Sequence, residues 1–137
     1  MSVLKLVETK PPEFIPEPVT DEEAAALLRA AVNLFKRWEL SDAQAAVLLD
    51  TPLRTYARWK TAAPPRFGRD LKARLSNLMG IHKALRIMFR EPQRGYGWVK
   101  RTNSAFGGQT PLEVMLGGEL TDLMRVRRYL DAERGAW

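Results

Sequence analysis

The segment LLDTPLRTYARWK, residues 48–60, carries basic side chains at a spacing that suits contacts with an anion. Arg54 and Arg58 are four residues apart, so they lie on the same side of a helix. Pro52 is suited to the first position of that helix, and Thr55 shares its outer face. Arginine can donate two hydrogen bonds to the edge of guanine, and it also binds phosphate. The segment therefore indicates nucleic-acid binding, with a solvated charged face as the alternative.

The surrounding residues have the pattern of a helix-turn-helix, residues 20–66, whose second helix would enter the major groove of DNA. The small residue at the helix crossing and the apolar anchors around the turn are Ala46, Leu49, Tyr56 and Trp59. Asp50 stands in the turn, where aspartate tolerates a left-handed backbone, and Thr51 is expected to cap the next helix. We expect base contacts from Arg54, Thr55 and Arg58, and phosphate contacts from Ser41, Gln44 and Lys60.

The helix before this unit is expected to begin at Thr20, which forms a capping box with Glu23. Its buried stripe should consist of Leu27, Leu28, Ala31, Leu34, Phe35 and Trp38. Residues 1–19 are rich in proline, which removes backbone donors and blocks helix, so they are predicted to form a flexible arm.

The second half is also expected to be helical, which makes the predicted fold all-α. A long amphipathic helix should run from about Arg69 to Phe89, and the proline and glycines of residues 91–97 should stop it. Thr110 and Pro111 have the pattern of a capped helix start. The remaining expected elements are a loop at 102–109, a short helix ended by Gly117-Gly118, a last helix near Thr121–Glu133 and the tail RGAW.

Composition narrows the classes of partner and of chemistry. The net charge is +6, but residues 52–94 hold eleven lysines and arginines against two acids, a net of +9. Such a concentration suits phosphate neutralisation. The chain has no cysteine and one histidine, His82, and no apolar run reaches the roughly 18 residues of a membrane span. We therefore expect a cytoplasmic protein with no cofactor, no metal and no membrane contact; a small enzyme is the weakest hypothesis, since no nucleophile–base pair stands out.

The stretch GWVKRTNSAFGGQTPLEVMLGGELTDLMRVRRYL resembles the toxin-binding domain of the MbcA/ParS/Xre antitoxin family. The residues that carry the resemblance are Trp98, Asn103, Phe106, Gly107, Thr110, Pro111, Leu112, Leu116 and Gly117. The helix-turn-helix and the long helix also fit the family's layout, so the resemblance extends over roughly residues 20–137.

The resemblance implies a partner toxin of the RES type, which consumes NAD or transfers its ADP-ribose. It implies that residues 67–137 form a toxin-binding and dimerisation domain whose carboxy-terminal tail blocks the toxin's active site, and that the helix-turn-helix represses the operon's own promoter. The toxin-binding residues expected on this basis are Trp98, Asn103, Arg127, Arg128, Asp131, Arg134, Gly135 and Trp137. The residues alone favour a structural reading instead, in which Trp137 packs on the helical core or the tail is frayed.

A plain DNA-binding regulator, whose second half only dimerises, remains the alternative. A homodimer is expected in either case, because helix-turn-helix proteins generally bind paired half-sites. Ile81, Ile87 and Met88 lie beyond the main apolar stripe of the long helix and are expected to serve both the core and a second subunit.

Overall fold

The computed structural model describes residues 18–135, and the regular structure in this range is entirely helical, as the sequence predicts. The elements are α1 (Asp21–Arg37), α2 (Asp42–Leu48), α3 (Leu53–Trp59), α4 (Arg69–Met88), α5 (Pro92–Trp98), the 3₁₀ helix η1 (Ser104–Phe106), α6 (Pro111–Met115) and α7 (Leu120–Gly135). The arm predicted for residues 1–19 lies outside this range except for its last two residues.

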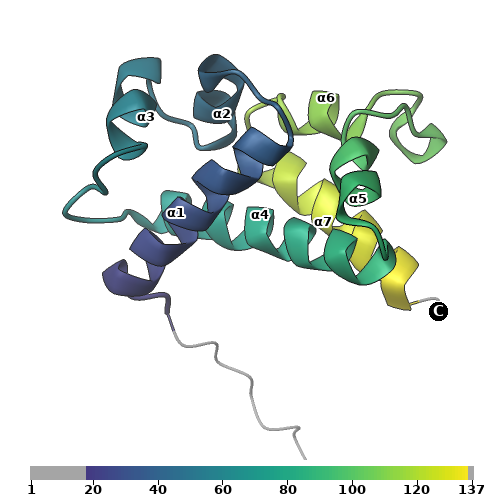
Figure 1. Cartoon of the computed structure of the whole chain (residues 1–137), viewed down its shortest axis with the longest axis horizontal. Coiled ribbons are helices and arrows are strands. Elements are labelled where there is room, and N and C mark those ends of the chain that lie inside the picture. Colours follow the sequence, from purple (N-terminus) through teal and green to yellow (C-terminus); the bar gives the residue numbers. More distant parts are fainter. Residues whose placement is uncertain (1–17, 136–137) are drawn as a thin grey trace, which may run out of the picture.

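The long helix α4 is the element on which the other helices assemble. It packs against α7 along most of its length, against α1 on another side, and against α5 near its end. Figure 1 shows α1 crossing α4, with α2 and α3 at one end of the molecule and α5 and α6 at the other. Because α4 has 20 residues, it is about 30 Å long and reaches both ends.

Three helices begin at the capping boxes that the sequence contains. Thr20, Ser41 and Thr110 each accept a hydrogen bond from the backbone N–H three residues later, and each donates its own N–H to the side chain there, at 2.7 to 3.1 Å. These reciprocal bonds satisfy donors that a helix start otherwise leaves free. The predicted starts of α1 and α6 are thereby confirmed, and α2 begins after Ser41 in the same way.

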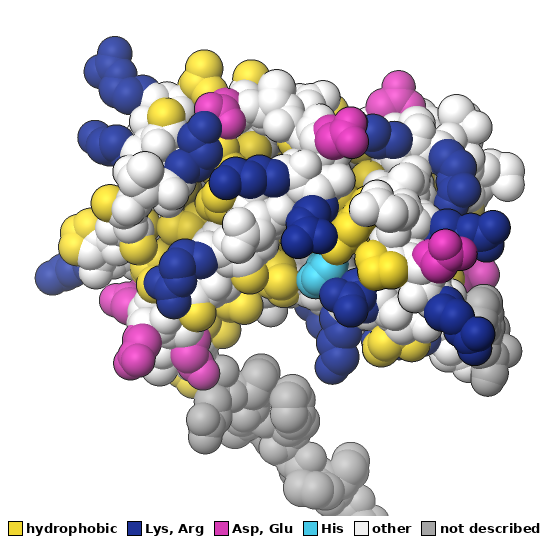
Figure 2. Space-filling view, viewed as in Figure 1, with side chains coloured by type: hydrophobic (Ala, Val, Ile, Leu, Met, Phe, Trp, Pro, Cys, Tyr) yellow, Lys and Arg dark blue, Asp and Glu magenta, His cyan; other side chains and the backbone are white. Residues whose placement is uncertain are grey.

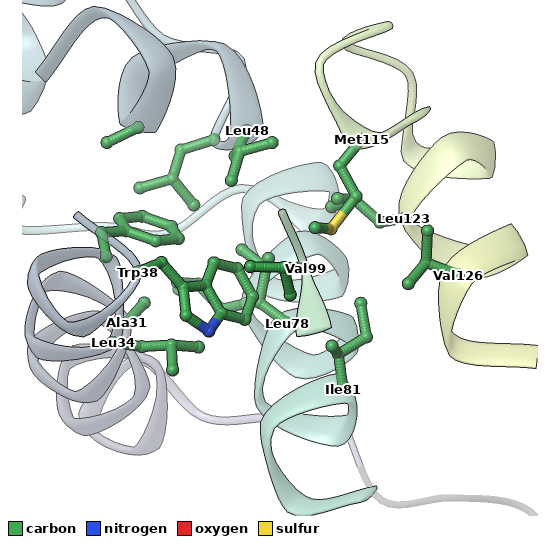
Figure 3. Packing of buried hydrophobic residues seen from close by; sticks show 14 of the residues in the cluster. Ala31, Leu34, Trp38, Leu48, Leu78, Ile81, Val99, Met115, Leu123 and Val126 are labelled. Atoms are coloured by element: carbon green, nitrogen blue, oxygen red, sulfur yellow. The ribbon is translucent and has the colours of Figure 1, made fainter. Parts of the chain in front are cut away.

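One apolar core runs through both halves of the chain. The predicted stripe of α1 is buried except for Leu27, which is half-buried. In Figure 3, Trp38 of α1 lies beside Val99, while Leu78 and Ile81 of α4 extend the core toward Met115 and Leu123. Ile81 is fully buried, so it belongs to this core and is not available to a second subunit.

The structure corrects three details of the prediction. Residues 92–98 form helix α5 and not only a stop: Pro92 occupies its first turn, and Gly95 is buried against Leu85 of α4. Thr51 does not cap α3: the cap position is Pro52, and no side chain caps this helix. The last helix does not end at Glu133 but continues to Gly135, so Arg134 is helical; Trp137 lies outside the described residues.

Candidate DNA-binding and toxin-binding sites

The turn between α2 and α3 has a defined backbone geometry. Asp50 adopts φ 51°, the left-handed conformation expected of it. The N–H groups of Asp50 and Thr51 donate to the carbonyls of Val47 and Ala46, each at 3.0 Å, and so close the end of α2. The chain therefore reverses within a few residues, as a helix-turn-helix requires.

Helix α3 is seated by aromatic side chains on its inner face. Tyr56 is buried, and its ring centroid lies 6.2 Å from that of Phe35 in α1. Burial, with a smaller contribution from the negative charge of Asp42, raises the pKa of Tyr56 to about 12. Trp59 is half-buried against the core. These contacts leave the opposite side of α3 facing outward.

The three predicted base-reading residues lie on that outward side. Arg54 and Arg58 are exposed, and Thr55 is half-buried between them. Leu53 at the start of α3 is 52% exposed, and with Val47 and Ile87 it is one of the large apolar side chains that residues 18–135 leave at the surface. Within residues 18–135, neither arginine lies within ion-pair distance of an acid. Both guanidinium groups can therefore bind an anionic partner without first breaking an ion pair with an acidic side chain of these residues.

The three predicted phosphate-binding residues already have intramolecular contacts. The Ser41 hydroxyl and the Gln44 side chain form the capping box of α2. Lys60 Nζ lies 2.7 Å from Asp42 Oδ2, which joins the end of α3 to the start of α2. Both partners of that ion pair are partly exposed, so its contribution is small and a phosphate can compete for the lysine.

Arg74 of α4 binds the backbone at the turn between α2 and α3, a role that sequence reasoning missed. Its side chain is 4% exposed; Nη1 donates to the Leu48 carbonyl at 3.2 Å and Nε to Asp70 Oδ2 at 2.7 Å. The Leu48 carbonyl would ordinarily accept from the N–H four residues later, but that residue is Pro52, which has none. The Asp70–Arg74 spacing indicates an ion pair on one helix; nothing in the sequence indicates the contact with Leu48.

The eleven basic residues between 52 and 94 do not form one patch. Arg54 and Arg58 lie on α3, whereas Lys83 and Arg86 lie toward the other end of the long helix α4 and Arg94 lies on α5. Figure 2 shows lysine and arginine side chains spread over the whole visible face. A count along the sequence therefore overstates the charge that a single duplex could contact next to α3.

The second predicted surface is built around aromatic rings from three elements. The ring of Trp98 is stacked on Tyr129 of α7 with centroids 6.1 Å apart, and Phe106 of η1 meets Tyr129 edge-on at 5.2 Å. The guanidinium of Arg125 lies over the Phe106 ring, 5.2 Å from its centroid. Trp98 and Tyr129 are half-buried, so part of each ring remains open to a partner.

Asn103 has a local structural role beside these rings. Its Oδ1 accepts from the Ala105 N–H at 2.9 Å and so caps η1, while its backbone carbonyl accepts from Phe106 and Gly108. The loop then turns through Gly107 and Gly108, which have φ values of 65° and 88°. This conformation favours glycine, which explains the Gly-Gly pair at this position.

The predicted residues on α7 differ in how far they are engaged within the chain. Arg127 lies across α4: its guanidinium occupies the space that a Cβ at Gly80 would need, and it donates to the Ser76 carbonyl at 3.4 Å. Asp131 lies 3.7 Å from Arg127 and 3.8 Å from Arg134. Arg128 and Gly135 are exposed. Arg127 thus joins α4 to α7, which sequence reasoning missed.

Residues 18–135 lack two features that bear on metal binding and on membrane insertion. The part of the chain that is described has no group of three or more histidine, aspartate or glutamate side chains arranged to hold a metal ion. None of its helices combines the length and apolar character that a membrane crossing needs.

Each half of the chain matches a known protein family. Residues 17–80 match the antitoxin Xre-like helix-turn-helix domain, and residues 84–135 match the antitoxin Xre/MbcA/ParS C-terminal toxin-binding domain. The chain is also 47% identical over 66 residues to a Sinorhizobium fredii (strain NBRC 101917 / NGR234) protein named "Uncharacterized protein y4oB", an alignment over 48% of this chain and 51% of that protein. The chain thus spans about half the length of this curated relative. With a helix-turn-helix domain followed by a toxin-binding domain, the chain belongs to the Xre/MbcA/ParS antitoxin family.

Proposed function

We propose that this chain neutralises a RES-type, NAD-consuming or ADP-ribosylating toxin and represses its own operon by binding DNA. The observation that carries the proposal is the pairing of the two family domains in one chain. The outward arginines of α3 and the half-buried rings near α7 offer a separate surface for each activity. Each surface has its own test.

DNA binding is assigned to Arg54, Thr55 and Arg58 of α3. The exposure of both arginines supports this assignment, as does the lack of an ion pair to either of them among residues 18–135. Each well-placed arginine–guanine contact is worth about 1 to 3 kcal/mol. The variant Arg54→Ala/Arg58→Ala should therefore bind a duplex from the region upstream of its own gene at least tenfold more weakly, as measured by fluorescence anisotropy.

A matched control separates base reading from general charge. The variant Arg66→Ala/Arg69→Ala removes the same two charges from exposed positions near the start of α4. It should lose much less affinity than the α3 variant at the same salt concentration. Equal losses in the two variants would show that α3 does not read the operator.

Toxin neutralisation is assigned to the last residues, 131–137, with help from Trp98, Asn103, Arg127 and Arg128. Leu130 is the last buried residue within the described range, 18–135, so deletion of residues 131–137 removes the end of α7 without removing a residue of the described core. The deletion should abolish neutralisation of a co-expressed RES-type toxin, measured as recovery of cellular NAD, and leave operator binding unchanged. Neutralisation by the truncated chain at full strength would refute the blocking role, and lack of neutralisation by the intact chain would refute the RES assignment.

A homodimer is proposed as the DNA-binding form. Ile87 of α4 is 56% exposed and follows directly on Arg86, while its neighbour Met88 is only half-buried, so the end of this helix is the contact that we assign to a second subunit. Ile87→Asp should shift the sedimentation coefficient from dimer to monomer, whereas Arg69→Asp, exposed at the opposite end of the same helix, should not. A monomeric unmodified chain would exclude this contact.

A further inference from the structure

Two adjoining hollows are lined by none of the residues assigned to the DNA-binding and toxin-binding surfaces. The larger, of about 290 Å³, opens between α1, α4 and α5, and its walls include Arg37, Met79, His82, Arg86 and Tyr96. The smaller, of about 150 Å³, shares Arg37 and Tyr96 with it. In Figure 2 the histidine is visible among lysine and arginine side chains on this face.

The larger hollow brings together two positively charged arginines that no acidic side chain of residues 18–135 neutralises. Arg37 comes from the last turn of α1 and Arg86 from α4, and no aspartate or glutamate of the described residues lines this hollow. Within residues 18–135, neither guanidinium lies within ion-pair distance of an acid. Glu39 reaches only the smaller hollow, which Lys100 also lines. Like charges held close together are unfavourable, and an anion between them relieves the repulsion.

Aromatic contacts hold two of the three basic groups in place. The His82 ring is nearly parallel to Tyr96, at 7° with centroids 6.5 Å apart, and the Arg37 guanidinium lies 5.8 Å from the Tyr96 centroid. Burial, Arg86 and Arg37 together lower the pKa of His82. The effect of the two arginines on the histidine agrees with a positive potential in this hollow.

We propose that this hollow is a binding site for a small phosphate-bearing anion, with Arg37 and Arg86 as its principal ligands. Two guanidinium forks from different helices can each donate paired hydrogen bonds to phosphate oxygens, a geometry that suits phosphate better than a single-point charge would. His82 is placed to add a donor on the α4 side, and Met79 supplies apolar wall for the organic part of a phosphate ester. The site stands independently of the toxin and DNA assignments.

The test is titration of the full chain with inorganic phosphate and with pyrophosphate, followed by nuclear magnetic resonance of the Tyr96 and His82 rings. Saturable shifts are expected, with pyrophosphate binding more tightly because it offers more oxygens and charge. Arg86→Gln and Arg37→Gln should each weaken pyrophosphate binding about tenfold, since each removes a charge-assisted hydrogen bond. Both residues are exposed at the surface, so neither change should unfold the chain.

Arg90→Gln is the matched control, because Arg90 is exposed just beyond α4 and does not line the hollow. Unchanged binding by this variant supports a localised site, whereas a loss equal to that of Arg86→Gln means diffuse attraction and overturns the proposal. Absence of saturable shifts with either anion also overturns it.

The phosphate could belong to a small molecule or to the backbone of DNA, and a duplex distinguishes the two. If Arg86→Gln weakens pyrophosphate binding and leaves operator affinity unchanged, the site takes a small anion. If it lowers operator affinity as much as Arg54→Ala/Arg58→Ala while the unmodified chain does not bind pyrophosphate, the hollow is a DNA contact and the proposal is wrong.

Discussion

Replacing Arg74 by methionine should destabilise the protein through the turn between α2 and α3. Methionine keeps the apolar stem of the side chain but removes the guanidinium that reaches the Leu48 carbonyl at 3.2 Å and Asp70 at 2.7 Å. Leu48 is fully buried, and its carbonyl has no N–H donor four residues later because that residue is Pro52. The substitution therefore leaves a buried acceptor without its partner.

The expected loss can be worked out from these contacts. A buried polar group left without a hydrogen bond costs about 1 to 3 kcal/mol. The Asp70 side chain is 55% exposed, so its ion pair with Arg74 is screened by solvent and adds only about 0.3 to 0.5 kcal/mol. The contact with Asp50 at 3.9 Å is longer, and its carboxylate is 70% exposed. Arg74→Met should thus lower the free energy of unfolding by about 2 kcal/mol.

Urea denaturation followed by circular dichroism measures this difference. Arg69→Met is the control: it removes the same charge from the exposed first residue of the same helix and should change stability by less than about 0.5 kcal/mol. Arg74→Lys should fall between the two, because one ammonium group cannot reproduce the fork that reaches both partners. A loss below about 0.5 kcal/mol in Arg74→Met would refute the view that this residue holds the turn.

Three further outcomes follow from local geometry. Glu39 adopts φ 57°, a conformation that costs glycine less than other residues. Glu39→Gly should therefore raise the free energy of unfolding, measured by urea denaturation, by about 0.5 to 1 kcal/mol. A lower free energy of unfolding would mean that the Glu39 side chain makes a stabilising contact larger than this conformational cost. Thr110→Ala removes the capping box of α6 and should cost about 1 kcal/mol by the same measurement, whereas Thr121→Ala, at an exposed position in α7, should have little effect. Burial, Arg86 and Arg37 lower the pKa of His82, which nuclear magnetic resonance should place below 6.5. The unfolded chain then binds the proton more readily than the folded chain does, so the free energy of unfolding should decrease as the pH falls below 6.5. His82→Gln should remove this part of the pH dependence. An ordinary or raised pKa would contradict the contacts around the hollow.

Much of the fold follows from signals that act within a few residues. The capping boxes at Thr20, Ser41 and Thr110 and the apolar spacing of α1 identify the helix starts and the buried face, because both depend only on neighbours along the chain. The prediction missed α5, because a proline and two glycines indicated only the end of the long helix. Gly95 is buried against Leu85 of α4, so α5 forms where it can pack on that helix. Such a contact is not visible in local propensity.

The candidate sites likewise combine features that local sequence predicts with contacts that it does not predict. The outward position of Arg54 and Arg58 follows from helical periodicity once Tyr56 is placed inward. The contact of Arg74 with Leu48 joins residues 26 apart, and that of Arg127 with Ser76 joins residues 51 apart. No spacing rule relates such pairs, so the sequence places Arg74 only among the basic residues suited to phosphate and Arg127 only among the expected toxin contacts.

Helix α4 connects the two candidate sites physically. Toward its start, Arg74 holds the turn that orients α3; toward its middle, Ile81 is fully buried and Gly80 gives room to Arg127 of α7. Helices α1 and α7 both bury apolar residues against α4, so neither half of the chain has a complete core without it. Although α4 follows the helix-turn-helix in sequence, it supports that unit through α1 and the Arg74 contact as much as it supports the toxin-binding domain through α7.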